Sequence, residues 1–332
     1  MIVRDIMADF ELYQPTQLKD AFALLDQYGK DAWKMGGGYD SLSWFKERHK
    51  QPKAVIDLGG IAEMKGISET ADGVTIGALT TLTEIENDPI IKGKYRVLAE
   101  AAAKVASPQI RNAGTVGGNV SQDARCLYYR YGLPCYRAGG NTCFADTPEG
   151  VNREHALFES DRCVAVSPSD TAVALVALDA KYVLRSSKGE RIVSAEDFFV
   201  GPKVDIMHLT STRPEEILVA INIPKKWAGS AFYFEKVADR NTWDFALVNV
   251  ASAIVVKNGV IEDCRIVCNG VSAVPRRLTA VESIVKGKPM SEEIAKLAGQ
   301  SSTRGARPLN YNGFKIPLMA NLVTRAIRDA KV

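Results

Sequence analysis

One segment organises the chain: Ser107-Pro-Gln-Ile-Arg-Asn-Ala-Gly-Thr-Val-Gly-Gly-Asn-Val-Ser-Gln-Asp-Ala-Arg-Cys126. Its centre, Thr115-Val-Gly-Gly-Asn119, consists of small residues that let the backbone approach a ligand closely. The segment runs directly into the first of four cysteines. We interpret the loop as a phosphate cradle and the cysteines as a redox-cluster site, so a cofactor and a metal centre are expected close together.

Length and composition limit what the chain can be. With 332 residues, 46% hydrophobic and 24% charged, it is expected to form two or three soluble globular domains. A net charge of +3 with no long Lys/Arg run argues against nucleic-acid binding, and no apolar run reaches the ~20 residues that span a bilayer. The acids in Met1–Phe10 do not suit a signal peptide. We expect a cytoplasmic protein, periplasmic only if it is exported with a partner.

A second glycine loop lies earlier in the chain. A helix is predicted over Thr16–Tyr28, a strand over Ala32–Met35, and a further helix ending at His49, with Gly36-Gly-Gly-Tyr-Asp-Ser41 between the last two. A strand, a glycine turn and a helix start present free N–H groups to an anion. The loop is neither the G-x-G-x-x-G fingerprint nor a P-loop. Two such loops could hold the two ends of a diphosphate, although two unrelated tight turns remain an alternative.

The remaining elements suggest a boundary near residues 225–228. The pattern from Asp123 to Asp170 is irregular, and a structureless stretch of that length is usually functional. Helices are predicted at 95–105, 171–179, 276–286, 291–298 and 317–330, with a helix start at 79–86. Strands are predicted at 54–58, 73–78, 181–185, 231–235, 247–256 and 261–268.

The irregular stretch contains Cys126, Cys135, Cys143 and Cys163, separated by 8, 7 and 19 residues. Structural zinc sites usually show C-x2-4-C pairs, which are missing, and disulfides suit secreted chains. Four thiolates can hold an iron–sulfur cluster at varied spacing. Spacing alone therefore leaves a cluster, a zinc site and ordinary thiols open. Cys264 and Cys268, on one face of a predicted strand, are expected in the core, and of the three histidines only His155 could flank the cysteine site.

The chain resembles the FAD-binding, medium subunit of the molybdenum hydroxylases, the xanthine dehydrogenase and carbon monoxide dehydrogenase group. The resemblance covers nearly the whole chain. It rests on five motifs: Met35-Gly-Gly-Gly-Tyr-Asp-Ser-Leu42, Gln109-Ile-Arg-Asn-Ala-Gly-Thr-Val-Gly-Gly-Asn119, Ser167-Pro-Ser-Asp170, Lys236-Val-Ala-Asp-Arg-Asn-Thr-Trp-Asp-Phe-Ala246 and Asn312-Gly-Phe-Lys-Ile-Pro-Leu318.

The resemblance implies an α+β fold. Residues 1–226 would form a two-subdomain FAD-binding domain of the vanillyl-alcohol oxidase/PCMH type, with subdomains of about 1–57 and 58–226 and a cysteine-rich iron–sulfur insert at about 123–166. Residues 227–332 would form a smaller α+β domain of the CO dehydrogenase flavoprotein C-terminal type.

Within the family, the cysteine insert is similar to a subgroup that adds a 4Fe–4S cluster to this subunit. That subgroup includes bacterial aldehyde oxidoreductases and 4-hydroxybenzoyl-CoA reductase. The sequence around Arg125–Arg130 and Val151–Ala156 looks closer to the aldehyde oxidoreductase side, and the cysteine spacing departs from that of the CoA reductase. The first loop carries Tyr39 where many relatives have a small or polar residue, which puts that side-chain contact in doubt.

The resemblance implies site residues. Those expected to bind FAD are Met35, Gly36, Gly37, Gly38, Tyr39, Asp40, Ser41, Leu42, Ser107, Thr115, Val116, Gly117, Gly118, Asn119, Ser121, Asp123, Asp170 and Lys236. Backbone N–H groups of 36–40 and 116–119 would cradle the diphosphate, and Asp170 would bind a ribityl or ribose hydroxyl. Lys236, Arg240 and Asp244 are flavin-proximal candidates, with a surface or capping role for Asp244 equally open. Cys126, Cys135, Cys143 and Cys163 would ligate the cluster.

The resemblance also implies partners. A large subunit would hold molybdopterin and oxidise an aldehyde, a xanthine or another N-heterocycle, and a small subunit would carry 2Fe–2S clusters. Electrons would pass through FAD, with the 4Fe–4S cluster, to an external acceptor. Three alternatives remain: a 4-hydroxybenzoyl-CoA reductase-type subunit that runs electrons toward molybdenum, a stand-alone FAD-dependent oxidase, and a zinc-stabilised scaffold.

Overall fold

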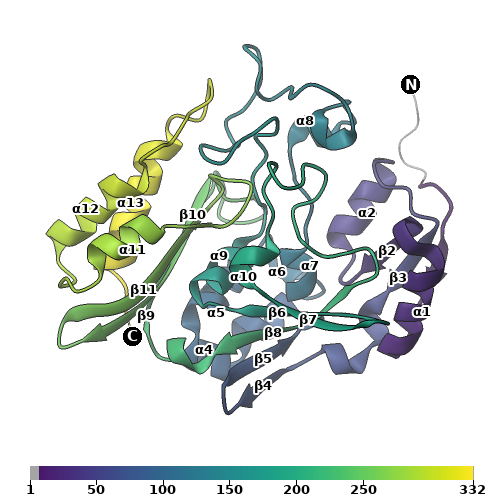
Figure 1. The fold of residues 1–332 in the computed structure, drawn as a ribbon, viewed down its shortest axis with the longest axis horizontal. Helices are drawn as coiled ribbons and strands as arrows, with labels where there is room; N and C mark the ends of the chain where they lie inside the picture. Colours follow the sequence, from purple (N-terminus) through teal and green to yellow (C-terminus); the bar gives the residue numbers. More distant parts are fainter. Residues whose placement is uncertain (1–6, 332) are drawn as a thin grey trace.

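The computed structural model describes residues 7–331 and contains three sheets, each with its own helices (Figure 1). The expectation for the first ten residues falls largely on residues 1–6, which lie outside this range. The N-terminal elements and the C-terminal helices lie at opposite ends of the molecule, with the largest sheet between them. In the described part of the chain, no helix is long and apolar enough to cross a membrane.

The N-terminal sheet is parallel, with the order β1-β3-β2. Its strands are β1 (Glu11–Tyr13), β2 (Ala32–Met35) and β3 (Ala54–Asp57), and its helices are α1 (Leu18–Tyr28) and α2 (Tyr39–Lys46). Helix α1 buries Leu18, Ala21 and Leu25, as its apolar period predicts. The helix was predicted from Thr16 but begins at Leu18, and the residue before it, Gln17, makes no side-chain cap bond.

The middle sheet is antiparallel, with the order β4-β5-β8-β6-β7. Its strands are β4 (Ile67–Thr70), β5 (Gly73–Gly77), β6 (Lys181–Ser186), β7 (Gly189–Ser194) and β8 (Ile217–Pro224). Its helices are α3 (Leu82–Asn87), α4 (Pro89–Lys94), α5 (Arg96–Ala103), α6 (Pro108–Arg111), α7 (Val116–Val120), α9 (Asp170–Ala177) and α10 (Ala195–Phe198). Every residue of α9 is buried, which explains why this helix is apolar on all sides.

The C-terminal sheet is also antiparallel, with the order β12-β11-β10-β9. Its strands are β9 (Ala231–Val237), β10 (Val248–Lys257), β11 (Val260–Asn269) and β12 (Arg276–Arg277). Its helices are α11 (Thr279–Val285), α12 (Glu292–Ser302) and α13 (Lys315–Arg328). Cys264 and Cys268 are fully buried on β11 and belong to the core of this domain, as expected.

The cysteine-containing segment, residues 123–166, has little regular structure, as predicted. It contains the one-turn helices α8 (Leu127–Arg130) and η4 (Tyr136–Ala138) and projects beyond the sheets (Figure 1). Ala124, Tyr129 and Cys135 pack against Trp44 and Phe45 of α2 in a small separate core. The segment is therefore anchored to the N-terminal subdomain by side chains rather than by strand pairing.

Two predicted helices begin later than the sequence pattern indicates. The helix expected from Leu79 begins at Leu82, because Thr81 and Glu84 form a capping box that defines its first turn. The helix expected over 276–286 begins at Thr279, because Arg276 and Arg277 pair with Cys268 and Val267 as strand β12. In both cases local hydrogen bonds, and not the periodicity of apolar residues, determine the first residue of the helix.

Candidate functional site

The first glycine loop is built to receive an anion. Gly36–Gly38 connect β2 to α2, and Gly38 precedes the helix with a φ of 82°, a conformation that favours glycine. Within the described chain, no hydrogen bond uses the backbone N–H groups of Gly36, Gly37 or Gly38. These groups lie at the N-terminal, positive end of α2. They form the kind of cradle that binds a phosphate.

The second glycine loop packs directly against the first. A Cβ added to Gly37 would lie 2.1 Å from the carbonyl oxygen of Ala113, and one added to Gly36 would lie 2.9 Å from Oγ1 of Thr115. Such contacts are far shorter than real Cβ contacts. The close approach of the two backbones therefore requires glycine at position 37, whereas a Cβ at position 36 would displace the Thr115 side chain. The pairing of the two loops is tertiary rather than local.

The structure corrects the expected role of the second loop. We predicted free N–H groups at 116–119, but each of them has an acceptor: Thr80 O, Ala78 O, Thr115 Oγ1 and Thr115 O, at 2.8 to 3.1 Å. Thr115 acts as the N-cap of α7, and Val116 and Gly117 are tied to the turn after β5. The cradle formed by free N–H groups is therefore confined to the first loop, and the second loop supports it from behind.

Some of the other first-loop residues are hydrogen-bonded to neighbouring side chains, and others are exposed to solvent. Ser41 accepts a hydrogen bond from Trp33 Nε1 at 2.8 Å, and Asp40 is bound to Arg125 and to Trp44 Nε1. Tyr39 is half exposed, and its hydroxyl lies 3.4 Å from the carbonyl of Gln109 in the second loop. Met35 and Leu42 flank the loop, and Leu42 is exposed.

Asn119 connects the second loop to the start of α9. Its Oδ1 accepts hydrogen bonds from the hydroxyls of Ser169 and Thr171, both at 2.6 Å. Ser169 in turn caps α9. Ser121, by contrast, is exposed at the end of α7. The Asn119 side chain, which we expected to contact the cofactor, thus holds together the two segments that carry the candidate site.

Asp170 and Lys236 form a buried ion pair. Nζ of Lys236 lies 2.6 Å from Asp170 Oδ2 and 2.9 Å from the carbonyl of Lys104. Asn249 donates to Asp170 Oδ1 at 2.8 Å. Burial raises the pKa of Asp170, and the Lys236 ammonium opposes that rise. The charge of Lys236, one of the flavin-proximal candidates, is therefore paired with that of Asp170.

The other two flavin-proximal candidates also pair with each other. Arg240 donates to Asp244 through its backbone N–H at 2.8 Å and through Nε at 2.9 Å. This hydrogen bond from the Arg240 side chain lowers the pKa of Asp244. The predicted alternative for Asp244, a capping or surface acid, matches this geometry.

A cavity of about 690 Å³ lies between the start of α9, the loop after β9 and the cysteine segment. This size is within the range of cofactor sites. Asn269 lines it, and its Oδ1 is buried with no partner in the described structure. Asn249 pairs with Asn269 across β10 and β11 and also has a buried, unpartnered Oδ1. Such orphan acceptors suit a ligand that donates hydrogen bonds.

Sequence reasoning missed Asn249 and Asn269. The available signal was an asparagine at the buried end of each of two neighbouring strands. Ser107, which was predicted, is also buried with an unpartnered hydroxyl. Of these three groups, Asn269 lines the cavity, and its unused acceptor together with the free N–H groups of the first loop fits a polar cofactor such as FAD.

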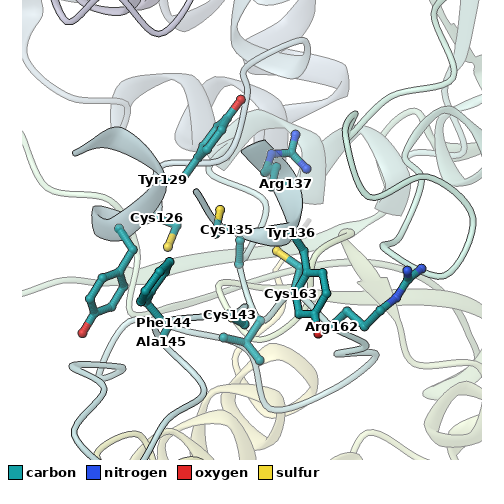
Figure 2. A pocket seen from close by; sticks show the side chains of 13 residues that line it. Cys126, Tyr129, Cys135, Tyr136, Arg137, Cys143, Phe144, Ala145, Arg162 and Cys163 are labelled. Atoms are coloured by element: carbon teal, nitrogen blue, oxygen red, sulfur yellow. The ribbon is translucent and has the colours of Figure 1, made fainter. Parts of the chain in front are cut away.

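The four predicted cysteines come together. Cys126, Cys135, Cys143 and Cys163 line one small cavity, together with Tyr136 (Figure 2). None of them is in a disulfide. The free space is about 20 Å³, room for roughly one water. A group bonded to the sulfurs needs less clearance, because a metal–thiolate bond of about 2.3 Å is much shorter than a van der Waals contact.

The chemistry of these thiols depends on their burial. Burial raises the pKa of Cys126 to about 11 and also raises that of Cys163, so both thiols are protonated at neutral pH unless a cation binds. Four thiols are the donor set of iron–sulfur clusters, and four cysteines line this cavity. No group of three or more His, Cys, Asp or Glu side chains among residues 7–331 is arranged to hold a metal ion.

Asp123, one of the residues expected to bind the cofactor, anchors the cysteine segment. Its carboxylate accepts from Arg137 Nε at 3.1 Å and from the Tyr129 hydroxyl at 3.1 Å, and Lys50 Nζ lies 3.4 Å away. Burial by itself raises the pKa of Asp123, but Arg137 and Lys50 more than offset this and hold it below its ordinary value. The carboxylate thus links the segment to the N-terminal subdomain.

Family models match both parts of the chain. The FAD binding domain in molybdopterin dehydrogenase matches residues 8–226, and the CO dehydrogenase flavoprotein C-terminal domain matches residues 232–330. The chain therefore belongs to the family of FAD-binding, medium subunits of the molybdenum hydroxylases of the xanthine and CO dehydrogenase type. Its relatives are subunits of dehydrogenases and oxidoreductases.

Individual relatives support this assignment. The carbon monoxide dehydrogenase medium chain of Hydrogenophaga pseudoflava is 28% identical over 325 residues, which are 97% of this chain and 96% of that one. The FAD-binding subunit of the aldehyde oxidoreductase of Escherichia coli (strain K12) is 32% identical over 301 residues, 90% of this chain and 91% of that one. The solved structure of the Hydrogenophaga pseudoflava dehydrogenase aligns with a TM-score of 0.77 at 27% identity, covering 98% of both chains. The predicted fold class is confirmed.

Proposed function

We propose that this chain is the FAD-binding electron-transfer subunit of a heteromeric molybdenum hydroxylase that oxidises an aldehyde, a xanthine or another N-heterocycle. The observation that carries the proposal is the first glycine loop, whose unused N–H groups lie at the start of α2. Its partners would be a large molybdopterin subunit and a small 2Fe–2S subunit. Named relatives that act on carbon monoxide, aldehydes and nicotinate support the reaction class.

The chain's own residues would divide the binding of FAD. The first loop would hold the diphosphate through Gly36, Gly37 and Gly38. The 690 Å³ cavity would hold the flavin end, where Asn269 has an unused acceptor. Bound FAD supplies the exchange between one-electron and two-electron carriers. The neutral Asp170–Lys236 pair fixes the cavity wall without adding charge to it.

The second part of the proposal concerns the cysteines. Cys126, Cys135, Cys143 and Cys163 would ligate a 4Fe–4S cluster, since they line one cavity and none is in a disulfide. Cys126 also lines the 690 Å³ cavity. A cluster held there would be next to the proposed flavin site and would serve as a further one-electron carrier on the route to an external acceptor.

A visible absorption spectrum tests both parts, with iron and zinc counted on the same purified chain. Flavin bands, a broad brown shoulder and about four irons per chain are expected. Flavin with zinc and no iron would leave the FAD assignment standing and remove the cluster. A folded sample with neither flavin nor metal would contradict the whole proposal.

A further inference from the structure

His155 lies beside the one cysteine that lines both cavities. Its Nε2 is 3.2 Å from Sγ of Cys126, and its side chain also lines the 690 Å³ cavity. The residue is 6% exposed, and its Nδ1 is buried with no partner in the described structure. Within the described structure, the contact with sulfur is thus the one hydrogen bond of the ring.

Two side chains of the C-terminal domain fix the backbone of this residue. The carbonyl of His155 accepts from Lys315 Nζ at 3.1 Å and from Asn312 Nδ2 at 3.0 Å. Lys315 is fully buried and also donates to the carbonyl of Gly270 at 2.7 Å. Both of these acceptors of the buried Lys315 amine are thus backbone carbonyls, and a buried amine without such partners would be costly. The C-terminal domain therefore fixes the backbone of His155, whose Nε2 lies 3.2 Å from Cys126 Sγ.

A metal-bound thiolate can only accept a hydrogen bond, so the imidazole must donate through Nε2–H. Adding an electron to an iron–sulfur cluster increases the negative charge on its sulfurs. A donor aimed at one sulfur therefore stabilises the reduced form more than the oxidised form.

We propose that His155 is a positioning residue for the cysteine site: it donates Nε2–H to the Cys126 thiolate and raises the reduction potential of the cluster. The inference rests on the cluster proposed above. It assigns His155 a role at the sulfur that borders the proposed flavin cavity. Lys315 and Asn312 then have a function beyond packing, because they hold the donor in place.

The test compares His155→Leu with His155→Gln in the full chain with its cofactors, by electron paramagnetic resonance during a redox titration. Leu removes the donor, and Gln places an amide N–H near the position of Nε2. We expect His155→Leu to shift the reduced-to-oxidised ratio at a fixed potential about tenfold toward the oxidised form, ~59 mV for a one-electron couple. His155→Gln should stay near the unmodified chain, as should the control His208→Leu, which changes an exposed histidine paired with Asp205.

The outcomes separate this inference from the cluster proposal. Iron in the unmodified chain, with a lowered potential or lost iron only in His155→Leu, supports the donor role. An unchanged potential in His155→Leu overturns it while the cluster stands. Equal shifts in the Leu and Gln variants also overturn it, because they would indicate packing. No iron in the unmodified chain would end both proposals.

Discussion

The glycine-loop region and the cysteine segment are built in opposite ways. The glycine loops lie at the ends of regular elements, and their key atoms are backbone N–H groups and carbonyls in close contact. The cysteine segment has almost no regular structure, and its position depends on side chains such as Asp123 and Arg137 on one side and Lys315 on the other. One region is a backbone site on a rigid frame, and the other is a side-chain site held between two domains.

This difference in construction predicts that the two regions respond differently to substitutions. A substitution that adds a Cβ where the two loop backbones are in contact should disrupt the loops, because no space is left between them. The segment should tolerate local changes in shape but fail when one of its few side-chain anchors or thiols is removed. The two sites should also lose their cofactors independently, although they adjoin through Cys126.

The largest effect is expected from Cys135→Ser, which should lose all of the ~4 irons per chain while FAD is retained. Serine is a poor ligand for this cluster, and Cys135 is buried in the cysteine cavity. Iron analysis and the flavin spectrum measure the two cofactors separately. Cys264→Ala, in the core of the C-terminal domain, is the control and should keep both. Joint loss of iron and flavin would show that the sites are not independent.

Lys236→Met should destabilise the protein by about 3–5 kcal/mol, because it leaves the Asp170 carboxylate buried without its cation. The midpoint of urea unfolding measures this effect. Lys236→Met combined with Asp170→Asn should recover part of the loss, since no buried charge then remains. A double variant as unstable as the single one would mean that packing, and not the charge, is responsible.

Gly37→Ala should weaken FAD binding about ten- to a hundredfold, because the added Cβ forces the two loops apart at a typical cost of 1–3 kcal/mol. Flavin released from equal amounts of protein gives the measurement. Gly93→Ala is a matched control: Gly93 lies in α4, and a Cβ there meets nothing within 4 Å. The iron content of Gly37→Ala should be unchanged, and a parallel loss of iron would break the contrast between the two regions.

The smallest effect is a pH dependence at the anchor of the cysteine segment. The pKa of Asp123 is lowered from 3.8, so its stabilising contribution is present above that pH and is lost as the pH falls through the lower, folded-state value. Peptic cleavage within residues 123–166 should therefore rise below about pH 4. Pepsin should cleave the Asp123→Asn variant to a similar extent above and below about pH 4, because this variant has no carboxylate to titrate at position 123. Cleavage of the unmodified chain that does not change with pH would argue against this anchor.

The positions of the first glycine loop and of the cysteine segment could be predicted from the sequence. The strand–glycine–helix pattern located the first loop, and the irregular stretch with four cysteines located the segment. The partners of individual polar groups were not predictable. Asp170 and Lys236 were both named as cofactor ligands, but they pair with each other across 66 residues. The N–H groups of 116–119 were expected to be free and are all used.

By itself, the sequence determined the local conformations, because glycine, proline and apolar period act over a few residues. It also determined which residue types could form the candidate sites, namely small residues in two loops and cysteines in an irregular segment. Only the tertiary structure decided which polar atoms stay unused, since hydrogen-bond partners such as Asn119 and Thr171, or Lys315 and His155, come from segments far apart in the chain. A ligand is bound by polar atoms that have no hydrogen-bond partner within the protein. Which atoms these are depends on how the folded chain pairs its own donors and acceptors.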